Sequence, residues 1–355
     1  MIVKFDSYTI RKSEVGKMIK VKKLLSLTLV ASLLTFMLTG CSSNETTETT
    51  APVNNETAVP ESKPGGGLGG GSFDDSAIKN KFLGISYSTL SETQKLNIYL
   101  PNEGEGPFPV IVAIHGGAFK MGDRTGGDLA PMLEGVNRGY AVVTVDYRLS
   151  GEAIFPAAVN DVKAAIRFIR QNSEKYGLNP DRIATWGDSA GGNLAAIAGT
   201  TGGTDELYDP LLGMTDVSDK ITAVVDWFGP LDFLKMDEQF EASGINPAFG
   251  KTSAATSPES AYIGQLITEV PEKTALADPS HYVSADDPAF FIQHGTMDAN
   301  VPKEQSINFA DYLKKVISEE KVTLILIEGA AHGGDQFSSN ENLDLVYEFL
   351  DKYMK

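Results

Sequence analysis

Gly187-Asp188-Ser189-Ala190-Gly191 lies between a stretch typical of a buried strand and a stretch typical of a helix. Arg182-Ile183-Ala184-Thr185-Trp186 precedes it, and Gly192-Asn193-Leu194-Ala195-Ala196 follows it. A serine at such a sharp strand-to-helix turn is held in a strained backbone conformation with its hydroxyl exposed. Its neighbours must be small, because the turn is tight and other backbone approaches it closely. In this context the pattern predicts that Ser189 is the nucleophile of a hydrolytic enzyme.

Apolar runs alternate with amphipathic stretches along most of the chain. Two alternating segments, at 81–88 and 94–100, predict an antiparallel edge pair. The runs at 110–114, 140–145, 182–186, 221–225, 289–292 and 322–327 predict buried strands. Helical spacing follows Pro156 up to about Gly177, and recurs at 304–316 and 342–354. Strands that alternate with helices predict the α/β class, with a mostly parallel central sheet flanked by helices.

A serine hydroxyl needs a base to take its proton, and the base needs an acid to orient it. His332 lies in a loop of small residues directly after the last apolar run, and Asp298 follows the preceding run. The chain order Ser189, Asp298, His332 is the serine, acid, histidine order of α/β-hydrolases. Asp226, Glu328 and Asp335 are alternative acids, but Glu328 is only four residues from His332 and poorly angled to pair with it. The other histidines, His115, His281 and His294, are interpreted as structural.

A site that stabilises the negative charge developing on the substrate oxygen during the reaction is also predicted. The run 110–114 leads into His115-Gly116-Gly117-Ala118, which matches the beginning of an HGGG-type oxyanion loop. We therefore expect the backbone N–H groups of Gly116, Gly117 and Ala190 to form an oxyanion hole. His115, Tyr147 and Arg148 are expected to brace this region, and Asp188 to tie down neighbouring loops.

Together these motifs resemble the α/β-hydrolase esterase/lipase group, close to its hormone-sensitive-lipase-like and bacterial feruloyl-esterase-like branches. The residues that carry the resemblance are His115-Gly116-Gly117, Tyr147-Arg148-Leu149, Gly187–Gly192, His294-Gly295 with Asp298, and His332. It spans about residues 81–355 and implies an α/β-hydrolase fold. It also implies nucleophile, acid and base at Ser189, Asp298 and His332.

The first 40 residues are typical of an export signal. Four lysines between Lys17 and Lys23 precede an apolar run at 24–38, which is short for a membrane span but suits a signal peptide. Leu38-Thr39-Gly40-Cys41 resembles the bacterial lipobox, so Cys41 is the expected lipid attachment site. The start is either Met1 or Met18.

Residues 41–78 are predicted to form a disordered tether, because they are rich in Thr, Asn, Glu, Pro and Gly. The expected location is extracytoplasmic, at the surface of a bacterial membrane.

Residues 79–355 are therefore assigned to one hydrolase domain, in which 231–287 is long for a connection and is read as a small inserted cap. Phe233, Phe240, Phe249 and Tyr262 either line a substrate pocket or form the core of this cap. The net charge of −17 at pH 7 argues against nucleic-acid binding. No residue cluster with metal-ligand spacing appears in the sequence, so neither a metal nor an organic cofactor is expected.

The expected activity is hydrolysis of short-chain, aryl or carbohydrate-linked esters through an acyl-enzyme. Small-molecule esters are then the partners, and the membrane is contacted only through the N-terminal lipid. A serine peptidase of the same fold is one alternative. A cell-surface lipoprotein that binds ligands on a non-catalytic hydrolase scaffold is the other.

Overall fold

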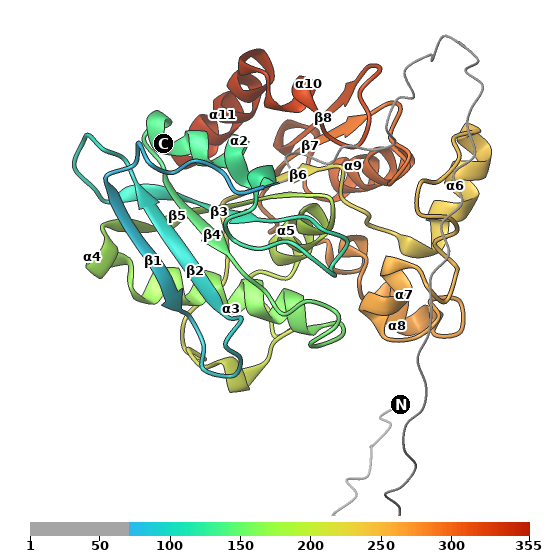
Figure 1. Ribbon diagram of the computed structural model, residues 1–355, viewed down its shortest axis with the longest axis horizontal. Coiled ribbons are helices and arrows are strands. Elements are labelled where there is room, and N and C mark those ends of the chain that lie inside the picture. Colours follow the sequence, from blue (N-terminus) through green and yellow to red (C-terminus); the bar gives the residue numbers. More distant parts are fainter. Residues whose placement is uncertain (1–70) are drawn as a thin grey trace, which may run out of the picture. The chain divides into compact units, whose positions relative to one another are not determined.

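The computed structural model describes residues 71–355 (Figure 1). The predicted signal peptide, Cys41 and the tether up to residue 70 lie outside the described residues. Residues 71–78 were assigned to the tether, yet they lie against the folded unit. The N–H of Phe73 donates to the carbonyl of Thr125 at 3.1 Å, and its ring meets Tyr99 edge to face at 5.7 Å. No helix within 71–355 combines the length and the apolar character needed to cross a bilayer.

One eight-stranded sheet forms the centre of this unit. Its strands are β1 (Asn80–Ser86), β2 (Lys95–Leu100), β3 (Phe108–Ile114), β4 (Ala141–Val145), β5 (Leu178–Asp188), β6 (Ala223–Trp227), β7 (Ala289–Gly295) and β8 (Val322–Ile327). They lie in the order β1-β2-β4-β3-β5-β6-β7-β8. β1 and β2 pair antiparallel, β2 pairs antiparallel with β4, and all later neighbours are parallel. The predicted parallel sheet with an antiparallel edge pair is confirmed.

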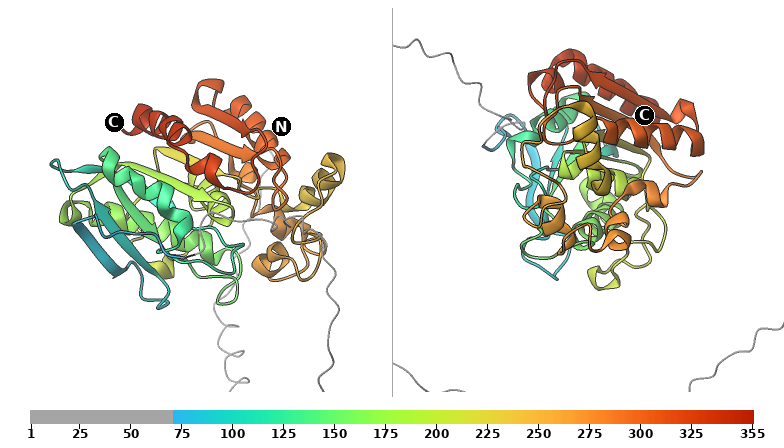
Figure 2. Two further views of the ribbon diagram at one scale, coloured as in Figure 1. Left: turned by 45° about the horizontal axis from the view of Figure 1, so that its top comes forward. Right: turned by 90° about the vertical axis from the view of Figure 1, so that its right-hand side faces the viewer.

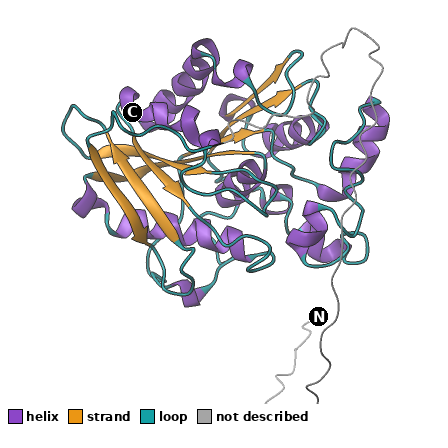
Figure 3. Cartoon of the chain, viewed as in Figure 1, coloured by secondary structure: helices purple, strands orange, loops and turns teal. Residues whose placement is uncertain are grey.

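Helices cover both faces of the sheet (Figure 3). The α-helices of residues 71–355 are α2 (Ala130–Leu133), α3 (Ala157–Gln171), α4 (Ser173–Tyr176), α5 (Ala190–Thr200), α6 (Met236–Ser243), α7 (Pro258–Ile263), α8 (Pro271–Ala275), α9 (Glu304–Val316), α10 (Asp335–Ser338) and α11 (Asn340–Met354). Helices α3, α5 and α9 contribute to one core cluster, and α2 and α11 contribute to the other. The predicted helix after Pro156 is interrupted at Asn172, so it forms α3 and the short α4.

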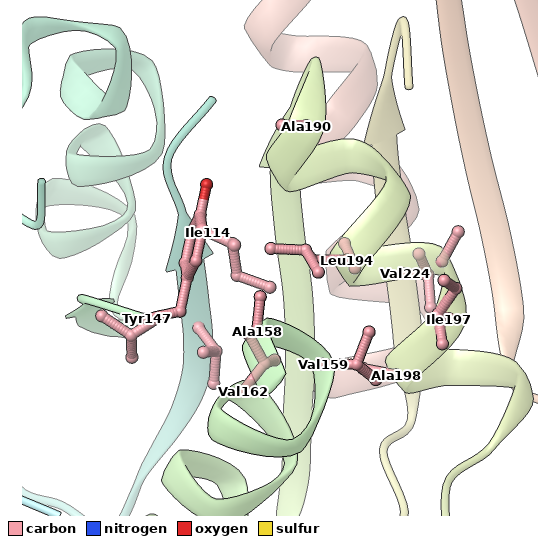
Figure 4. Close-up of a cluster of buried hydrophobic side chains, with 14 of the residues drawn as sticks. Ile114, Tyr147, Ala158, Val159, Val162, Ala190, Leu194, Ile197, Ala198 and Val224 are labelled. Carbon is pink, nitrogen blue, oxygen red and sulfur yellow. The ribbon is translucent and has the colours of Figure 1, made fainter. Parts of the chain in front are cut away.

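Alternation along the strands divides the core between the two faces. On β3, Val110 and Val112 belong to the cluster on the α3 and α5 side, whereas Ile111 and Ala113 belong to the opposite cluster. Figure 4 shows the first cluster, in which side chains of α3 and α5 meet those of the sheet. Fully burying one such Val, Ile or Leu side chain contributes about 1.5–3 kcal/mol. Because side chains on both faces of β3 are buried, its residues 110–114 are apolar without interruption.

The long connection between β6 and β7 holds the helices α6, α7 and α8. Figure 2 shows this part (yellow to orange) at the opposite end of the molecule from β1 and β2 (blue). Phe233, Phe240 and Tyr262 are buried in the core, whereas Phe249 is 65% exposed. The Tyr262 ring stacks on Phe119 at 3.9 Å, so the insertion packs on the loop that follows β3. Three of the four aromatic residues singled out in the sequence thus serve packing, and a role of the insertion as a cover over the site remains a prediction.

Sheet order decides where the functional loops meet. β5 lies between β3 and β6, and β7 and β8 follow. The predicted nucleophile follows β5, the predicted oxyanion loop follows β3, and the predicted acid and base follow β7 and β8. Since these strands are parallel, all four loops leave the sheet at its carboxyl edge, where ligands bind in open α/β sheets.

Candidate active site

Ser189 occupies the strained turn that its sequence pattern predicts. It joins β5 to α5 with φ 52° and ψ −121°, a conformation that non-glycine residues rarely adopt. Its N–H donates to the carbonyl of Trp227 at 2.9 Å, which anchors the turn to β6. A Cβ on Gly187 would lie 2.1 Å from the carbonyl oxygen of Gly191, and one on Gly191 would lie 2.1 Å from that of Ile114. Glycine at both positions is therefore a steric requirement of this turn.

Gly191→Ala should prevent stable folding, because the added methyl group collides with backbone that cannot move aside. We expect a loss of more than about 4 kcal/mol in the free energy of unfolding, the range reserved for severe core disruption. The matched control is Gly151→Ala, where a Cβ meets nothing within 4 Å. Urea denaturation of both variants measures the difference, and equal midpoints would contradict this account of the turn.

His332 and Ser189 are within hydrogen-bond distance. His332 Nε2 lies 2.9 Å from Ser189 Oγ, although the residues are 143 positions apart in the chain. His332 is 7% exposed, and its ring centroid lies 4.6 Å from that of Phe228. The loop that carries His332 folds back over the end of β7, where Met297 N–H donates to the carbonyl of Ala330 at 2.8 Å. This arrangement lets the imidazole take a proton from the serine hydroxyl.

Asp298 completes the chain of hydrogen bonds. Its Oδ2 lies 2.7 Å from His332 Nδ1, and its Oδ1 accepts the backbone N–H groups of Asn300 and Val301 at 2.7 and 3.0 Å. Burial by itself would raise the pKa of this carboxyl. The facing His332, together with hydrogen bonds from His294 and His332, outweighs burial and lowers the pKa well below the usual range. Asp298 is thus held ionised, as the orienting acid must be.

The three alternative acids lie elsewhere. Glu328 and Asp335 are exposed, and Asp226 is buried at the end of β6, where its Oδ1 accepts the N–H of Gly229 at 3.0 Å. Burial raises the pKa of Asp226 to about 6. The structure therefore brings Asp298, and none of these three, against His332.

The oxyanion loop differs from its prediction at one position. The N–H of Gly116 donates to Asp128 Oδ2 at 3.1 Å, so it is not available to a substrate oxygen and the prediction for Gly116 is wrong. The N–H groups of Gly117 and Ala118 donate to no acceptor within residues 71–355. Ala190 is the first residue of α5, where an N–H has no partner inside the helix. Ala118 (φ 55°) replaces Gly116 as a candidate donor, a residue that sequence reasoning did not select.

Two of the three residues predicted to brace this loop, Tyr147 and His115, do contact it. Tyr147 Oη donates to the carbonyl of His115 at 3.0 Å, and its ring stacks on the His115 ring at 4.3 Å. His115 Nδ1 lies 2.8 Å from the carbonyl of Gly116. Arg148 lies apart from the loop, since its guanidinium pairs with the buried Asp161 at 2.8 Å.

His294 was interpreted as structural, but it contacts the acid directly. It is fully buried on β7, and its Nε2 lies 2.9 Å from the carbonyl of Val301 and 3.2 Å from Asp298 Oδ2. Both partners are acceptors, so Nε2 carries the proton. Its Nδ1 lies 2.7 Å from Ser306 Oγ. The Nε2–H of His294 is thus shared between the Val301 carbonyl and Asp298 Oδ2, and this carboxylate oxygen also accepts the Nδ1–H of His332 at 2.7 Å. In the sequence, the position of Asp298 four residues after His294, at the end of a strand, is the feature that could have indicated this contact.

His294→Phe should lower kcat about 10- to 100-fold, because a hydrogen bond to a charged group is worth about 1.5–3 kcal/mol. KM should change little, since His294 is buried behind Asp298 and does not face the substrate. His281→Phe is the matched control, because His281 is exposed and contacts Tyr282 rather than the site. Steady-state kinetics with p-nitrophenyl acetate would measure both variants. An unchanged kcat for His294→Phe would contradict the positioning role.

Comparison with known protein families assigns the chain to one of them. The profile of the BD-FAE family matches residues 96–313, which include the oxyanion loop, Ser189 and Asp298. The chain belongs to the BD-FAE family. Among curated relatives, the probable carboxylic ester hydrolase LipM of Mycobacterium tuberculosis is 29% identical over 257 residues, covering 72% of this chain and 56% of LipM. The chain thus spans about half the length of such relatives.

Solved structures also resemble this BD-FAE family member. A bifunctional GH43-CE protein of Bacteroides eggerthii is 33% identical with a TM-score of 0.68, covering 79% of this chain and 39% of that one. A truncated carbohydrate esterase from gut microbiota is 30% identical with a TM-score of 0.68, covering 79% of this chain and 99% of that one. These likenesses, with the sheet described above, establish the α/β-hydrolase fold.

Proposed function

We propose that this protein is a serine carboxylesterase in which Ser189, His332 and Asp298 are the nucleophile, base and acid. One observation carries the proposal: the continuous chain from Ser189 Oγ through both nitrogens of His332 to Asp298 Oδ2, with distances of 2.9 and 2.7 Å. A structural serine would not need a strained backbone with a buried imidazole and carboxylate aligned behind it. The esterases among its relatives and structural neighbours agree with this chemistry.

In the acylation step, Ser189 Oγ attacks the ester carbonyl carbon while His332 Nε2 takes the hydroxyl proton. The carbonyl oxygen becomes an oxyanion, which the N–H groups of Gly117, Ala118 and Ala190 stabilise. Asp298 stabilises the imidazolium that forms. The bond to the leaving alkoxide then breaks, and His332 returns its proton to that oxygen. The products are the free alcohol and an ester of Ser189.

Deacylation repeats these steps with water as the nucleophile. His332 Nε2 takes a proton from water, whose oxygen attacks the acyl carbon, and the same N–H groups hold the second oxyanion. Collapse of this intermediate breaks the bond to Ser189 Oγ, which recovers its proton from His332. The free acid leaves, and the enzyme returns to its first state.

The proposed substrates are esters of small acids or aryl acids, including esters carried by carbohydrates. Two solved structures at 30% identity or more are described as carbohydrate esterases or contain such a module, which supports the carbohydrate part. A panel of p-nitrophenyl acetate, p-nitrophenyl octanoate, acetylated xylan oligosaccharides and feruloylated arabinose would test the proposal. We expect turnover of the acetyl or feruloyl sugar esters above the octanoate. Binding of these sugars without turnover of any ester would favour the non-catalytic alternative.

We also propose export and lipid anchoring through Cys41, supported by the apolar run at 24–38 and the lipobox-like Leu38-Thr39-Gly40-Cys41. Cys41→Ala in the full-length chain, produced in a bacterial host, should move the protein from the membrane fraction to the soluble fraction. Immunoblots of both fractions would measure this. Unchanged fractionation would contradict the anchor and leave the catalytic proposal untouched.

A further inference from the structure

Gly116 lies between two carboxyl groups that belong to different elements. Asp128, on the short 3-10 helix Gly127–Leu129 that precedes α2, accepts the Gly116 N–H at 3.1 Å. Asp188, the last residue of β5, reaches Gly116 from another side: a Cβ on Gly116 would lie 2.7 Å from Asp188 Oδ2. Asp188 is 6% exposed, and its Oδ1 has no hydrogen-bond partner within residues 71–355. The mechanism above uses neither carboxyl group.

Asp188 is buried, Asp128 is half-buried, and both carboxyl groups lie against Gly116. Sharing one proton is then favoured, because a negative charge on Asp188 beside that of Asp128 would be neither solvated nor paired. Burial first, and then the charge of Asp128, raises the pKa of Asp188 well above its ordinary value. The titratable groups around the pair are His115 after β3 and Tyr147 and Asp146 after β4. Burial lowers the pKa of His115, which is therefore neutral. Asp146 is paired with Arg124.

We propose that Asp188 and Asp128 are positioning residues that hold the oxyanion loop against the nucleophile turn through one shared proton. Protonated Asp188 donates to the carboxylate of Asp128, which in turn accepts the N–H of Gly116. The hydroxyl of Tyr147 and the ring of His115 hold the carbonyl side of the same peptide segment. With Gly116 fixed on both sides, the N–H groups of Gly117 and Ala118 are held in place for the substrate oxygen. This role rests on the proposed function.

The proposal predicts that activity is lost at alkaline pH because Asp188 loses its proton. When the shared proton leaves, two carboxylates face each other across Gly116 and their repulsion displaces the loop. An asparagine at position 188 supplies an N–H donor to Asp128 that cannot be lost. Asp188→Asn should therefore keep most of the activity at pH 7 and extend it to higher pH. Asp188→Ala should lose about 100-fold in kcat/KM, as expected for one misplaced oxyanion donor.

The experiment measures kcat/KM of the full chain between pH 6 and pH 10 for wild type, Asp188→Asn, Asp188→Ala and the control Asp278→Asn. Asp278 is also a carboxyl of raised pKa, but it caps the 3-10 helix Pro279–Tyr282 in the insertion, away from Gly116. Inhibition by phenylboronic acid, whose adduct places an oxygen in the oxyanion hole, is measured in parallel. We expect its affinity to follow kcat/KM in every variant. The proposal would be overturned if Asp188→Asn were as inactive as Asp188→Ala. It would also be overturned if Asp188→Asn lost activity at the same alkaline pH as the wild type.

Thermal unfolding supplies a readout that does not depend on activity. A carboxyl whose folded pKa is raised favours folding fully at pH below its unfolded pKa, and this contribution is lost as pH rises through the folded pKa. The wild-type Tm should therefore fall relative to that of Asp188→Asn as pH rises above about 4. A constant Tm difference would overturn the shared proton. If the wild type hydrolyses no ester, the proposed function fails. The comparison of Tm values still shows whether Asp188 and Asp128 share a proton.

Discussion

Replacing Ser189 with alanine will remove ester hydrolysis almost completely, and this is the largest effect expected from any single substitution that preserves the fold. Loss of the nucleophile in a serine, histidine and acid site lowers kcat by about five to six orders of magnitude. Ser189 is partly accessible, and its Oγ contacts His332 Nε2 at 2.9 Å. Removing one oxygen atom leaves the strained backbone in place, since a Cβ already exists there. The variant should therefore fold normally.

Two measurements separate this result from simple misfolding. Hydrolysis of p-nitrophenyl acetate gives the rate, and mass spectrometry after treatment with paraoxon shows whether one phosphoryl group is attached at Ser189. Ser280→Ala is a matched control, because this half-buried serine belongs to the insertion and not to the site. We expect labelling and turnover in wild type and Ser280→Ala, and neither in Ser189→Ala. Turnover that survives in Ser189→Ala would refute the mechanism.

Local patterns made most of the scaffold predictable. β8 and α9 coincide with the segments 322–327 and 304–316 marked by continuous apolar character and by helical spacing. The tight turn at Ser189 was also predictable. Its glycines are required by contacts with residues a few positions away and with the neighbouring strand β3. These features depend on interactions that are local in sequence, or on the general geometry of a parallel sheet.

The incorrect oxyanion donor shows where such reasoning ends. Whether the N–H of Gly116 points at substrate depends on Asp128, which lies twelve residues later and accepts that N–H. Nothing in the glycine pattern itself contains this information. The role of His294 was missed for a related reason, since a buried histidine at a strand end is usually structural, and only its distance to Asp298 Oδ2 distinguishes it.

Asp298→Asn should lower kcat by about 10⁴-fold, the typical cost when the orienting acid becomes an amide. The geometry explains why the amide cannot substitute. Oδ1 of residue 298 accepts two backbone N–H groups, so the asparagine oxygen must remain there. Its NH₂ group then replaces Oδ2, facing His332 Nδ1 and the N–H of His294. His332 is forced to carry its proton on Nε2, and it can no longer accept the proton of Ser189.

Glu328→Gln is the matched control for Asp298→Asn, because Glu328 is exposed and only four residues from His332. Its kcat should equal that of the wild type, and the reverse order of effects would show that another carboxyl is the acid. Stability gives a second test. A carboxyl with a lowered folded pKa contributes stability above its unfolded pKa of about 4, and that contribution is lost as pH falls toward the lowered value. The Tm advantage of the wild type over Asp298→Asn should therefore shrink below about pH 4, and an advantage that grows in acid would mean that Asp298 is not held ionised.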